Sequence, residues 1–411
     1  MSAVFPFLLL PILVHNISVE NYGILSMAQT LLTIVASFVL FSLPGIAIEF
    51  HKKGKLELSS YIVTSVYLTV SGLLLVLLLL FLFKDSIVYY FNIPSFWVFF
   101  IPIIVFFGAL SQVILTIYQH SDRAIKYGVI TVLSSGLVFF IAIILLFIFK
   151  IDWESRLYAL FIVNVTMTVI CFFLLRREGY ISGFFQPSLV RKILFFTIPL
   201  IPHTLGAALY FMSDRLFISN MLDLESVGYY SAAVQIALVL SIVQDSIGRA
   251  WLPYVLKRLS TKNRKNDIEV VEKLNLVKKS YLIFFGVLIL GAAYTGFSYL
   301  IYKFVMPQGY YEYRFISYWL IISFTLLGMY KVVVPYIWHT ERGKYLGYIT
   351  TLVLFVNIAL NYLLIPKYGV LGATYATFIS FSIQFIATWY LSNKVYPMPW
   401  FDIQILSNKS S

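Results

Sequence analysis

The sequence has few charged residues and a single cysteine. Only 12% of its 411 residues are charged, whereas 60% are hydrophobic, and the mean hydropathy is +0.88. This composition excludes an ordinary soluble domain, in which about 25% of the residues are charged. The single cysteine, Cys171, excludes an intrachain disulfide and argues against a cysteine metal site. We therefore predict no metal site.

The chain also lacks the short motifs that mark several enzyme classes. No GxxxxGK[ST], HExxH or GxSxG motif occurs, which argues against nucleotide binding, zinc-dependent hydrolysis and serine hydrolysis. The strict alternation of a membrane β-barrel strand is missing too, as the run SGLLLVLLLLFLF at 71–83 illustrates. We predict an all-α integral membrane protein that is not an enzyme and needs no cofactor.

Apolar segments follow one another along almost the whole chain. A transmembrane helix needs roughly 20 apolar residues, because the hydrocarbon core of a bilayer is about 30 Å thick. Charged joints and joints rich in glycine or proline divide the chain into twelve apolar segments, of which the first is short. These segments are 1–14, 22–50, 58–83, 95–119, 128–149, 157–175, 193–218, 227–255, 280–303, 315–339, 345–365 and 370–392. We predict one transmembrane helix for each.

Lysine and arginine predict the orientation of these helices. The joints that follow the even-numbered segments, together with the C-terminal tail, hold 21 of these residues. The joints that follow the odd-numbered segments hold 6, counting Lys303 at the end of segment 280–303 with the joint after it. Short cytoplasmic joints are enriched in Lys and Arg, so both termini are expected in the cytoplasm. The net charge of +12 is concentrated in such joints, above all in 257–280. It therefore indicates contact with membrane lipids and gives no argument for nucleic acid.

Two stretches of the first half recur in the second half. At an offset of 205, ENYGILSMA (20–28) matches ESVGYYSAA (225–233), and at an offset of 219, HSDRAIKYGVIT (120–131) matches HTERGKYLGYIT (339–350). Each repeat holds six segments, an even number, so both copies enter the membrane in the same direction. Such parallel repeats occur in alternating-access transporters, whose substrate path lies between the halves.

The repeat predicts the domain organisation. We expect an N-terminal six-helix bundle at 1–180, a cytoplasmic linker at 181–192, a C-terminal six-helix bundle at 193–392 and a cytoplasmic tail at 393–411, with a central lumen between the bundles. The first offset aligns Met1 with Gly206, so the first helix lacks the counterpart of 193–205. Either the start of the protein lies upstream or this helix is trimmed.

Several ionisable residues lie inside the predicted helices. A charge in a membrane is costly unless it is paired or hydrated, so each such residue is a candidate for function. At 1.5 Å per residue, His203, Asp245 and Lys331 are predicted at about 16 to 18 Å from the cytoplasmic boundary, near the bilayer midplane. Arg249 follows Asp245 by one helical turn, which suits an ion pair between them. We predict that these four residues line the substrate path.

A second group of charges is expected at the two ends of the helices. Asp214 and Arg215 are about 33 Å from Lys192, at the outer boundary. Neighbouring residues of a helix point about 100° apart, so we expect different partners for Asp214 and Arg215 and assign them to an outer gate or helix lock. We place Glu49, Arg123 and Arg342 at the inner rim.

The charged residues inside the helices also predict the sign of the substrate's charge. The second half has three basic residues inside its helices, Arg215, Arg249 and Lys331, against two acidic ones, Asp214 and Asp245. Arginine and lysine bind phosphate well, and a low dielectric strengthens the attraction. An anionic substrate is therefore favoured, and a lipid that carries a pyrophosphate would fit.

The segment VNIALNYLLIPKYGVLGATYATFIS (356–380) resembles the C-terminal signature of polysaccharide-biosynthesis flippases. The stretches SVENYG (18–23), IPLIPHTLGAALYFMSDRLFISNML (198–222) and LESVGYYSAA (224–233) are similar to the same family. The resemblance covers essentially the whole chain. These stretches resemble the Wzx-type translocases of O-antigen and capsule repeat units, within the multidrug/oligosaccharidyl-lipid/polysaccharide superfamily.

The resemblance implies a fold and a function. Such proteins have two six-helix bundles and are thought to move an undecaprenyl-pyrophosphate-linked oligosaccharide across the bacterial inner membrane by alternating access. Asp214 and Arg215 match the family's Asp-Arg pair. The polysaccharide polymerase and the chain-length regulator are the implied protein partners. Coupling to Na⁺ or H⁺ stays open, with Asp245 the best-placed acid.

Three other functions fit the sequence less well. A lipid II flippase would be expected to have fourteen spans, and this chain has twelve predicted segments. A multidrug cation antiporter of the superfamily would need a carboxylate deep in the first half, where Glu49 lies near a helix end. An O-antigen polymerase, which is an enzyme, should have a large external loop, and no outward joint of the predicted topology exceeds about a dozen residues. Translocation of a lipid-linked oligosaccharide is the interpretation that the sequence favours.

Overall fold

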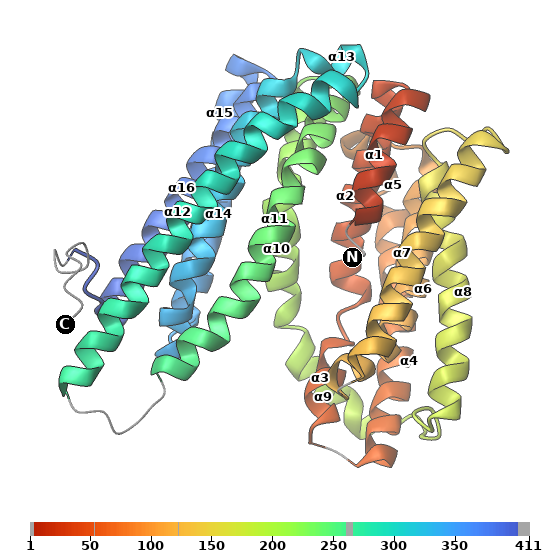
Figure 1. The fold of residues 1–411 in the computed structure, drawn as a ribbon. Helices are drawn as coiled ribbons and strands as arrows, with labels where there is room; N and C mark the ends of the chain where they lie inside the picture. Colours follow the sequence, from red (N-terminus) through yellow and green to blue (C-terminus); the bar gives the residue numbers. More distant parts are fainter. Residues whose placement is uncertain (1–3, 53, 122, 260–265, 402–411) are drawn as a thin grey trace. The chain divides into compact units, whose positions relative to one another are not determined.

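The computed structural model describes residues 4–52, 54–121, 123–259 and 266–401, and side chains within the last range from 270 onward. The chain divides into two compact units, Met1–Ser231 (unit 1) and Ala232–Ser411 (unit 2). Within the described residues the regular elements are sixteen helices, and no strand occurs (Figure 1). The predicted all-α fold class is confirmed.

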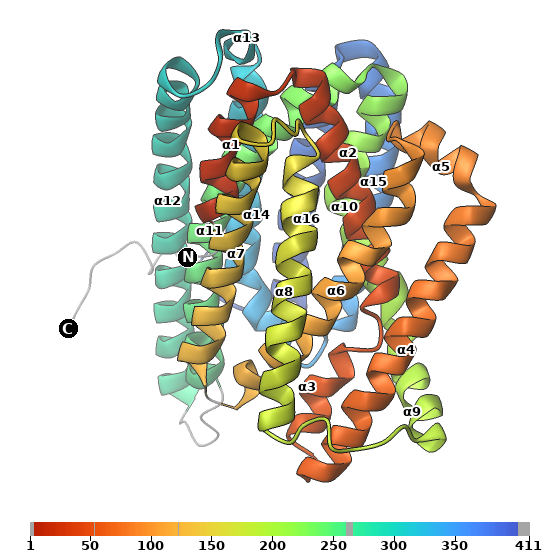
Figure 2. The same ribbon diagram turned by 90° about the vertical axis from the view of Figure 1, so that its right-hand side faces the viewer.

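Unit 1 contains ten helices and the first residues of an eleventh. They are α1 (Val4–Asn16), α2 (Val19–Val39), α3 (Pro44–Phe50), α4 (Lys55–Leu82), α5 (Lys84–Phe91), α6 (Ser95–His120), α7 (Ala124–Phe147), α8 (Ser155–Arg177), α9 (Pro187–Thr197), α10 (Leu200–Met221) and the start of α11 (Leu224–Leu259). Helix α6 packs against both α4 and α8 (Figure 2), and α2 packs against α6 and α10.

Unit 2 contains the rest of α11 and five further helices. They are α12 (Asn266–Phe304), α13 (Gln308–Tyr311), α14 (Arg314–His339), α15 (Lys344–Tyr368) and α16 (Val370–Val395). Helix α14 packs against α12 and α16, and α15 packs against α16. Gly369 joins α15 to α16 with a φ of 58°, a conformation that glycine adopts without steric cost.

Each of the twelve predicted apolar segments lies on one helix or on two consecutive helices. Ten of the described helices are long and apolar enough to cross a membrane by themselves. Helices α9 and α10, which meet at a bend of 43°, pass the same test together, so the number of candidate spans is eleven if this bent pair crosses as one. Pro199 caps α10 at this bend, and its ring nitrogen cannot donate the hydrogen bond that would continue α9. The first predicted segment corresponds to α1, an apolar helix of 13 residues that is shorter than these candidate spans.

Three boundaries differ from the predicted ones. The segment 22–50 is two helices, α2 and α3, because the chain leaves the helical conformation at 40–43 and Pro44 starts a new helix. Pro187 starts α9 inside the predicted linker. The basic joint 257–280 is largely helical, since α11 reaches Leu259 and α12 begins at Asn266. Residues 260–265 of this joint and 402–411 of the tail lie outside the described residues. The predicted domain boundaries stay predictions.

The repeat appears in unit 1 as a symmetric contact between α2 and the start of α11. A Cβ atom on Gly23 would lie 2.0 Å from the carbonyl oxygen of Leu224, and a Cβ atom on Gly228 would lie 2.2 Å from that of Val19. The hydroxyl oxygens of Ser26 and Ser231 are 2.6 Å apart. The offset of 205 relates Ser26 to Ser231, and it relates the Gly23–Leu224 contact to the Gly228–Val19 contact, because 23 maps to 228 and 19 maps to 224. The repeated segments therefore pack on one another, and glycine permits their close approach.

Candidate functional site

Asp214 and Arg215 bind different side chains of α11. The Asp214 carboxylate accepts a hydrogen bond from the Tyr230 hydroxyl. The Arg215 Nε donates to the Ser231 hydroxyl at 3.2 Å, and its Nη1 donates to the Phe211 carbonyl at 3.1 Å. Both charged residues are buried. Because buried charges are costly without hydrogen-bond partners, these contacts stabilise both residues inside unit 1.

The same contacts connect this pair to the repeat interface. Ser231, which accepts from Arg215, also contacts Ser26 of α2. The charged pair therefore lies where α2, α10 and α11 meet. These residues join helices, which is what a helix lock requires, and the roles of outer gate and helix lock stay predictions. Sequence reasoning did not identify Tyr230 and Ser231 as partners, although the repeat had singled out Ser231.

A pocket in unit 2 lies between one face of α11 and one face of α14. Its volume is about 330 Å³. The residues from α11 recur at the spacing of a single helical face, and most of those from α14 do so too. The lining residues are Asp245, Gly248, Arg249, Leu252, Tyr330, Lys331, Val334, Pro335 and Trp338. Three of the four predicted path residues thus lie around one cavity.

Gly328 permits a close approach of the two helices beside this pocket, and Gly248 faces the stem of Lys331 at an ordinary contact distance. A Cβ atom on Gly248 would meet the Cβ atom of Lys331 at 3.7 Å, and one on Gly328 would meet the Gln244 side chain at 2.5 Å. The indole of Trp251 donates to the carbonyl of Val332 at 2.9 Å. The stem of Lys331 therefore packs against α11, and its ammonium group is held at the pocket.

Lys331 forms an ion pair with Asp245 across the two helices. The Lys331 Nζ lies 2.5 Å from the Asp245 Oδ1, and 23% of the Lys331 side chain and 52% of the Asp245 side chain are exposed. The expected ion pair between Asp245 and Arg249 is wrong, because the Asp245 carboxylate pairs with Lys331 of the neighbouring helix α14. Among the described residues, Arg249 has no ion-pair partner, so the pocket keeps an uncompensated positive charge.

His203 and the inner-rim residues lie elsewhere. His203 is exposed on α10 of unit 1, and its place in the path stays a prediction. Glu49 is buried on α3 and pairs with Lys192 of α9 at 2.8 Å. Arg342 is exposed between α14 and α15. The partner of Glu49 was not predicted, because Lys192 is 143 residues away along the chain.

Arg123 belongs to a cluster around Glu178, the residue that follows α8. The Glu178 carboxylate accepts hydrogen bonds from the Tyr118 hydroxyl at 2.9 Å and from the Arg123 Nη1 at 2.6 Å, and Lys126 lies at 3.5 Å. Burial alone would raise the pKa of this carboxyl. The two hydrogen bonds and the charges of Arg123 and Lys126 outweigh burial and lower the pKa below its ordinary value.

The fold resembles those of solved membrane transporters. The chain superposes on the inward closed lipid II flippase MurJ with a TM-score of 0.71 at 17% identity, over 95% of this chain and 85% of that chain. A multidrug resistance MATE family transporter of the MOP superfamily, in its inward-facing conformation, gives a TM-score of 0.70 at 13% identity, over 96% and 95%. The class is therefore a multi-pass membrane protein with the two-repeat fold of these transporters.

The sequence comparisons identify the family. The chain matches the family described as "Polysaccharide biosynthesis protein" over residues 1–259, and it belongs to that family. It is 27% identical to "Lsg locus putative protein 1" of Haemophilus influenzae over 90% of this chain and 92% of that protein. It is 26% identical to the "Putative O-antigen transporter" of Shigella flexneri over 64% of this chain and 60% of that protein.

Proposed function

We propose that this protein translocates an undecaprenyl-pyrophosphate-linked oligosaccharide across the bacterial inner membrane by alternating access, for O-antigen, capsule or exopolysaccharide assembly. One observation carries the proposal, namely the pocket of unit 2 with Lys331 and Arg249 in its lining. The family, and the O-antigen transporter named among its relatives, support this substrate class.

The pocket suits a diphosphate. Lysine binds phosphate as a compact charge and arginine as a planar fork, so Lys331 and Arg249 offer both modes. The Asp245 carboxylate forms an ion pair with the Lys331 ammonium group at 2.5 Å. An incoming diphosphate competes with this carboxylate for Lys331 and engages Arg249 directly. Binding of the substrate thereby breaks a contact between α11 and α14, which gives the substrate a means of shifting the conformational equilibrium.

The other parts of the substrate follow different routes. The sugars pass through the lumen, while the polyprenyl tail stays in lipid, because moving its apolar surface into water is costly. The path leads past Arg249 and Lys331, with His203 along it, and leaves past Arg215. Asp245 is the candidate for coupling to Na⁺ or H⁺ once Lys331 is taken by the substrate. The polymerase and the chain-length regulator would receive the translocated unit.

Complementation of a deletion strain tests the pocket. We expect Lys331→Ala and Arg249→Ala each to lower surface polysaccharide at least tenfold, since a charge-assisted hydrogen bond contributes about 1.5 to 3 kcal/mol. Lys331→Arg keeps the charge and should retain most of the activity. Lys303→Ala, an exposed lysine at the end of α12, is the control for loss of a surface charge. Immunoblotting checks that all variants reach the membrane at equal levels.

The lipid fraction distinguishes translocation from other steps. We expect the lipid-linked repeat unit to accumulate in the deletion strain and in the two alanine variants. Wild-type surface polysaccharide in both alanine variants would refute the cationic pocket as the substrate site. Increased susceptibility to cationic drugs in the deletion strain, without accumulation of a lipid-linked intermediate, would instead indicate a multidrug antiporter.

A further inference from the structure

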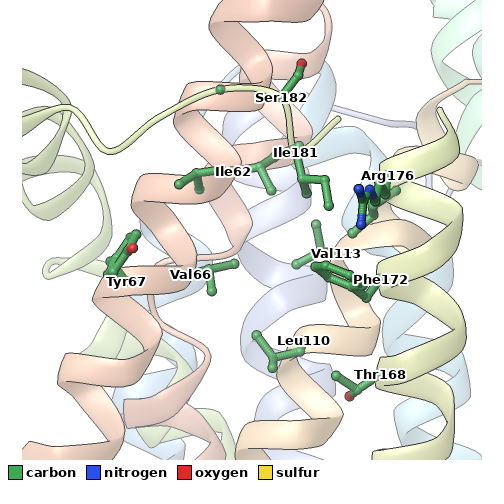
Figure 3. A pocket seen from close by; sticks show the side chains of 13 residues that line it. Ile62, Val66, Tyr67, Leu110, Val113, Thr168, Phe172, Arg176, Ile181 and Ser182 are labelled. Atoms are coloured by element: carbon green, nitrogen blue, oxygen red, sulfur yellow. The ribbon is translucent and has the colours of Figure 1, made fainter. Parts of the chain in front are cut away.

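A second, larger pocket lies in unit 1, on helices that carry none of the predicted path residues. It is formed by α4, α6, α8 and the segment 181–183, and its volume is about 690 Å³ (Figure 3). This volume falls in the range of roughly 300 to 1,000 Å³ that is usual for small-molecule sites. The lining is mainly apolar, with Ile62, Val66, Leu110, Val113 and Phe172 among its members.

The charged side chain of the pocket lies at one end, and hydroxyl groups occur along its whole lining. Arg176 and Ser182 lie at one end, whereas Leu110 and Thr168 lie at the other (Figure 3). Eight residues of α8 separate Thr168 from Arg176, which corresponds to about 12 Å along the helix. The Thr168 hydroxyl donates to the carbonyl of Phe107 at 2.7 Å, so it is already satisfied. The pocket is therefore amphiphilic, with a cationic end and an apolar end.

The charge of Arg176 is not compensated within the described part of the chain. Its side chain is exposed and has no ion pair or hydrogen bond among the residues that the structure describes. The nearest acid along the chain, Glu178, is occupied by Arg123 and Tyr118. An anionic group beside Arg176 would therefore gain a charge-assisted interaction without displacing another partner.

We propose that this pocket binds one anionic phospholipid of the cytoplasmic leaflet. The phosphate lies at Arg176, and an acyl chain lies between α4, α6 and α8. Ser182 lies at the same end of the pocket, and its hydroxyl donates to the carbonyl of Gly179 at 3.1 Å. Basic pockets between transmembrane helices on the cytoplasmic side are suited to anionic head groups. A sugar fits poorly, because the lining offers no carboxylate and no side-chain amide to bind its hydroxyl groups.

The position of the pocket gives the lipid a structural effect. The segment after α8 is attached to α4 by a hydrogen bond from the Gly183 amide to the Ser59 hydroxyl at 2.6 Å. A Cβ atom on Gly183 would lie 2.3 Å from the amide nitrogen of Ser60, so this contact is close. A lipid in the pocket would contact Arg176 of α8, Ser182 of the segment after α8, and Ile62 of α4. It would therefore connect α8, this segment and α4. Bound lipid should therefore raise the unfolding temperature of the protein.

Native mass spectrometry of the full-length protein tests this site. The protein is delipidated in detergent and titrated with phosphatidylglycerol or phosphatidylcholine. We expect one phosphatidylglycerol to bind at least fivefold more tightly than phosphatidylcholine. Arg176→Gln should reduce that preference about fivefold, since one basic residue near an anionic surface contributes about 1 kcal/mol. Arg177→Gln is the matched control, because Arg177 is the next residue of α8 and does not line the pocket.

Two further measurements show whether the phospholipid occupies this pocket. Leu110→Trp should fill the apolar end and abolish retention of both lipids, and its unfolding temperature without lipid shows whether the variant is folded. Equal losses in Arg176→Gln and Arg177→Gln, or no preference for phosphatidylglycerol, would overturn the proposal. Displacement of phosphatidylglycerol by an equimolar polyprenyl phosphate would also overturn it, by assigning the pocket to the transported lipid. None of these outcomes depends on the proposed translocation.

Discussion

Glu178 concentrates several interactions at the end of α8. Its carboxylate accepts hydrogen bonds from the Tyr118 hydroxyl and from Arg123, and the ammonium group of Lys126 is a third donor. These residues come from α6, from α7 and from the turn between them. One carboxylate therefore connects three consecutive membrane helices, and its negative charge pairs with Arg123 and Lys126.

Acid should weaken this connection. The pKa of Glu178 is lowered in the folded protein, so its stabilisation is fully present above the ordinary glutamate value of about 4.3 and is lost as the pH falls through the lowered folded value. We expect Glu178→Gln to be less stable than wild type at pH 7 and to show a smaller decrease in unfolding temperature between pH 6 and pH 3. Thermal unfolding in detergent measures both.

An exposed carboxylate supplies the comparison for this prediction. Glu312 is exposed after α13 and has no ion pair among the described residues, so Glu312→Gln should follow the wild-type pH profile. If Glu178→Gln and wild type lost stability in parallel as the pH fell, the carboxylate of Glu178 would not be the group responsible.

At the scale of helices, the contact between α2 and α11 depends on two glycines. Gly23→Ala and Gly228→Ala would each place a methyl group within about 2 Å of a backbone carbonyl of the opposite helix. A carbonyl in a helix cannot move aside as a flexible side chain can, so the helices must separate. We expect each variant to lose about 1 to 3 kcal/mol of stability, the usual cost of overpacking. The shift in unfolding temperature measures it.

Gly128 of α7 is the matched control. A Cβ atom there meets nothing within 4 Å, so Gly128→Ala should be neutral or slightly stabilising, because alanine favours the helix over glycine by about 1 kcal/mol. Because the contact is symmetric, Gly23→Ala and Gly228→Ala should have similar effects. A neutral result for either of them would show that α2 and α11 are not in contact at this position.

The sequence predicts the long helices well, because their length and apolar composition follow from the thickness of the bilayer. A helix must have about 20 apolar residues to cross the bilayer, so an apolar segment of that length marks the position of each long helix. The break at 40–43 and the bend between α9 and α10 were not predicted, because apolar residues continue through both. Pro44 and Pro199 were the available signals, but proline also occurs inside helices here, as at Pro102 of α6.

The site was predicted less completely than the fold. Depth along the helix grouped Asp245 and Lys331 correctly, because the axial rise is constant. The partner of Asp245 depends on how closely α11 and α14 pack. Gly328 permits this close packing, and periodicity does not show it. For the same reason, no sequence signal connected Arg176 to Ile62 or predicted the pocket between their helices.

At the scale of the whole molecule, the distribution of Lys and Arg predicts how the chain is oriented in the membrane. Cysteine labelling can test this orientation, because the chain has one native cysteine and Cys171 is buried. Ser86 on α5 and Ser188 on α9 are both exposed. The predicted topology places Ser86 in an outward joint and Ser188 in a cytoplasmic one.

We expect a membrane-impermeant maleimide to label Ser86→Cys in cells whose outer membrane alone has been permeabilised. Ser188→Cys should react only after the inner membrane is also opened, and the wild-type protein should stay unlabelled in both conditions. The distribution of Lys and Arg determines the orientation of the whole chain. If the predicted orientation is wrong, the accessibility of both cysteines must therefore be reversed together. Labelling of Ser188→Cys before the inner membrane is opened, with Ser86→Cys protected, would place both termini in the periplasm. It would also move the phospholipid proposed at Arg176 to the outer leaflet.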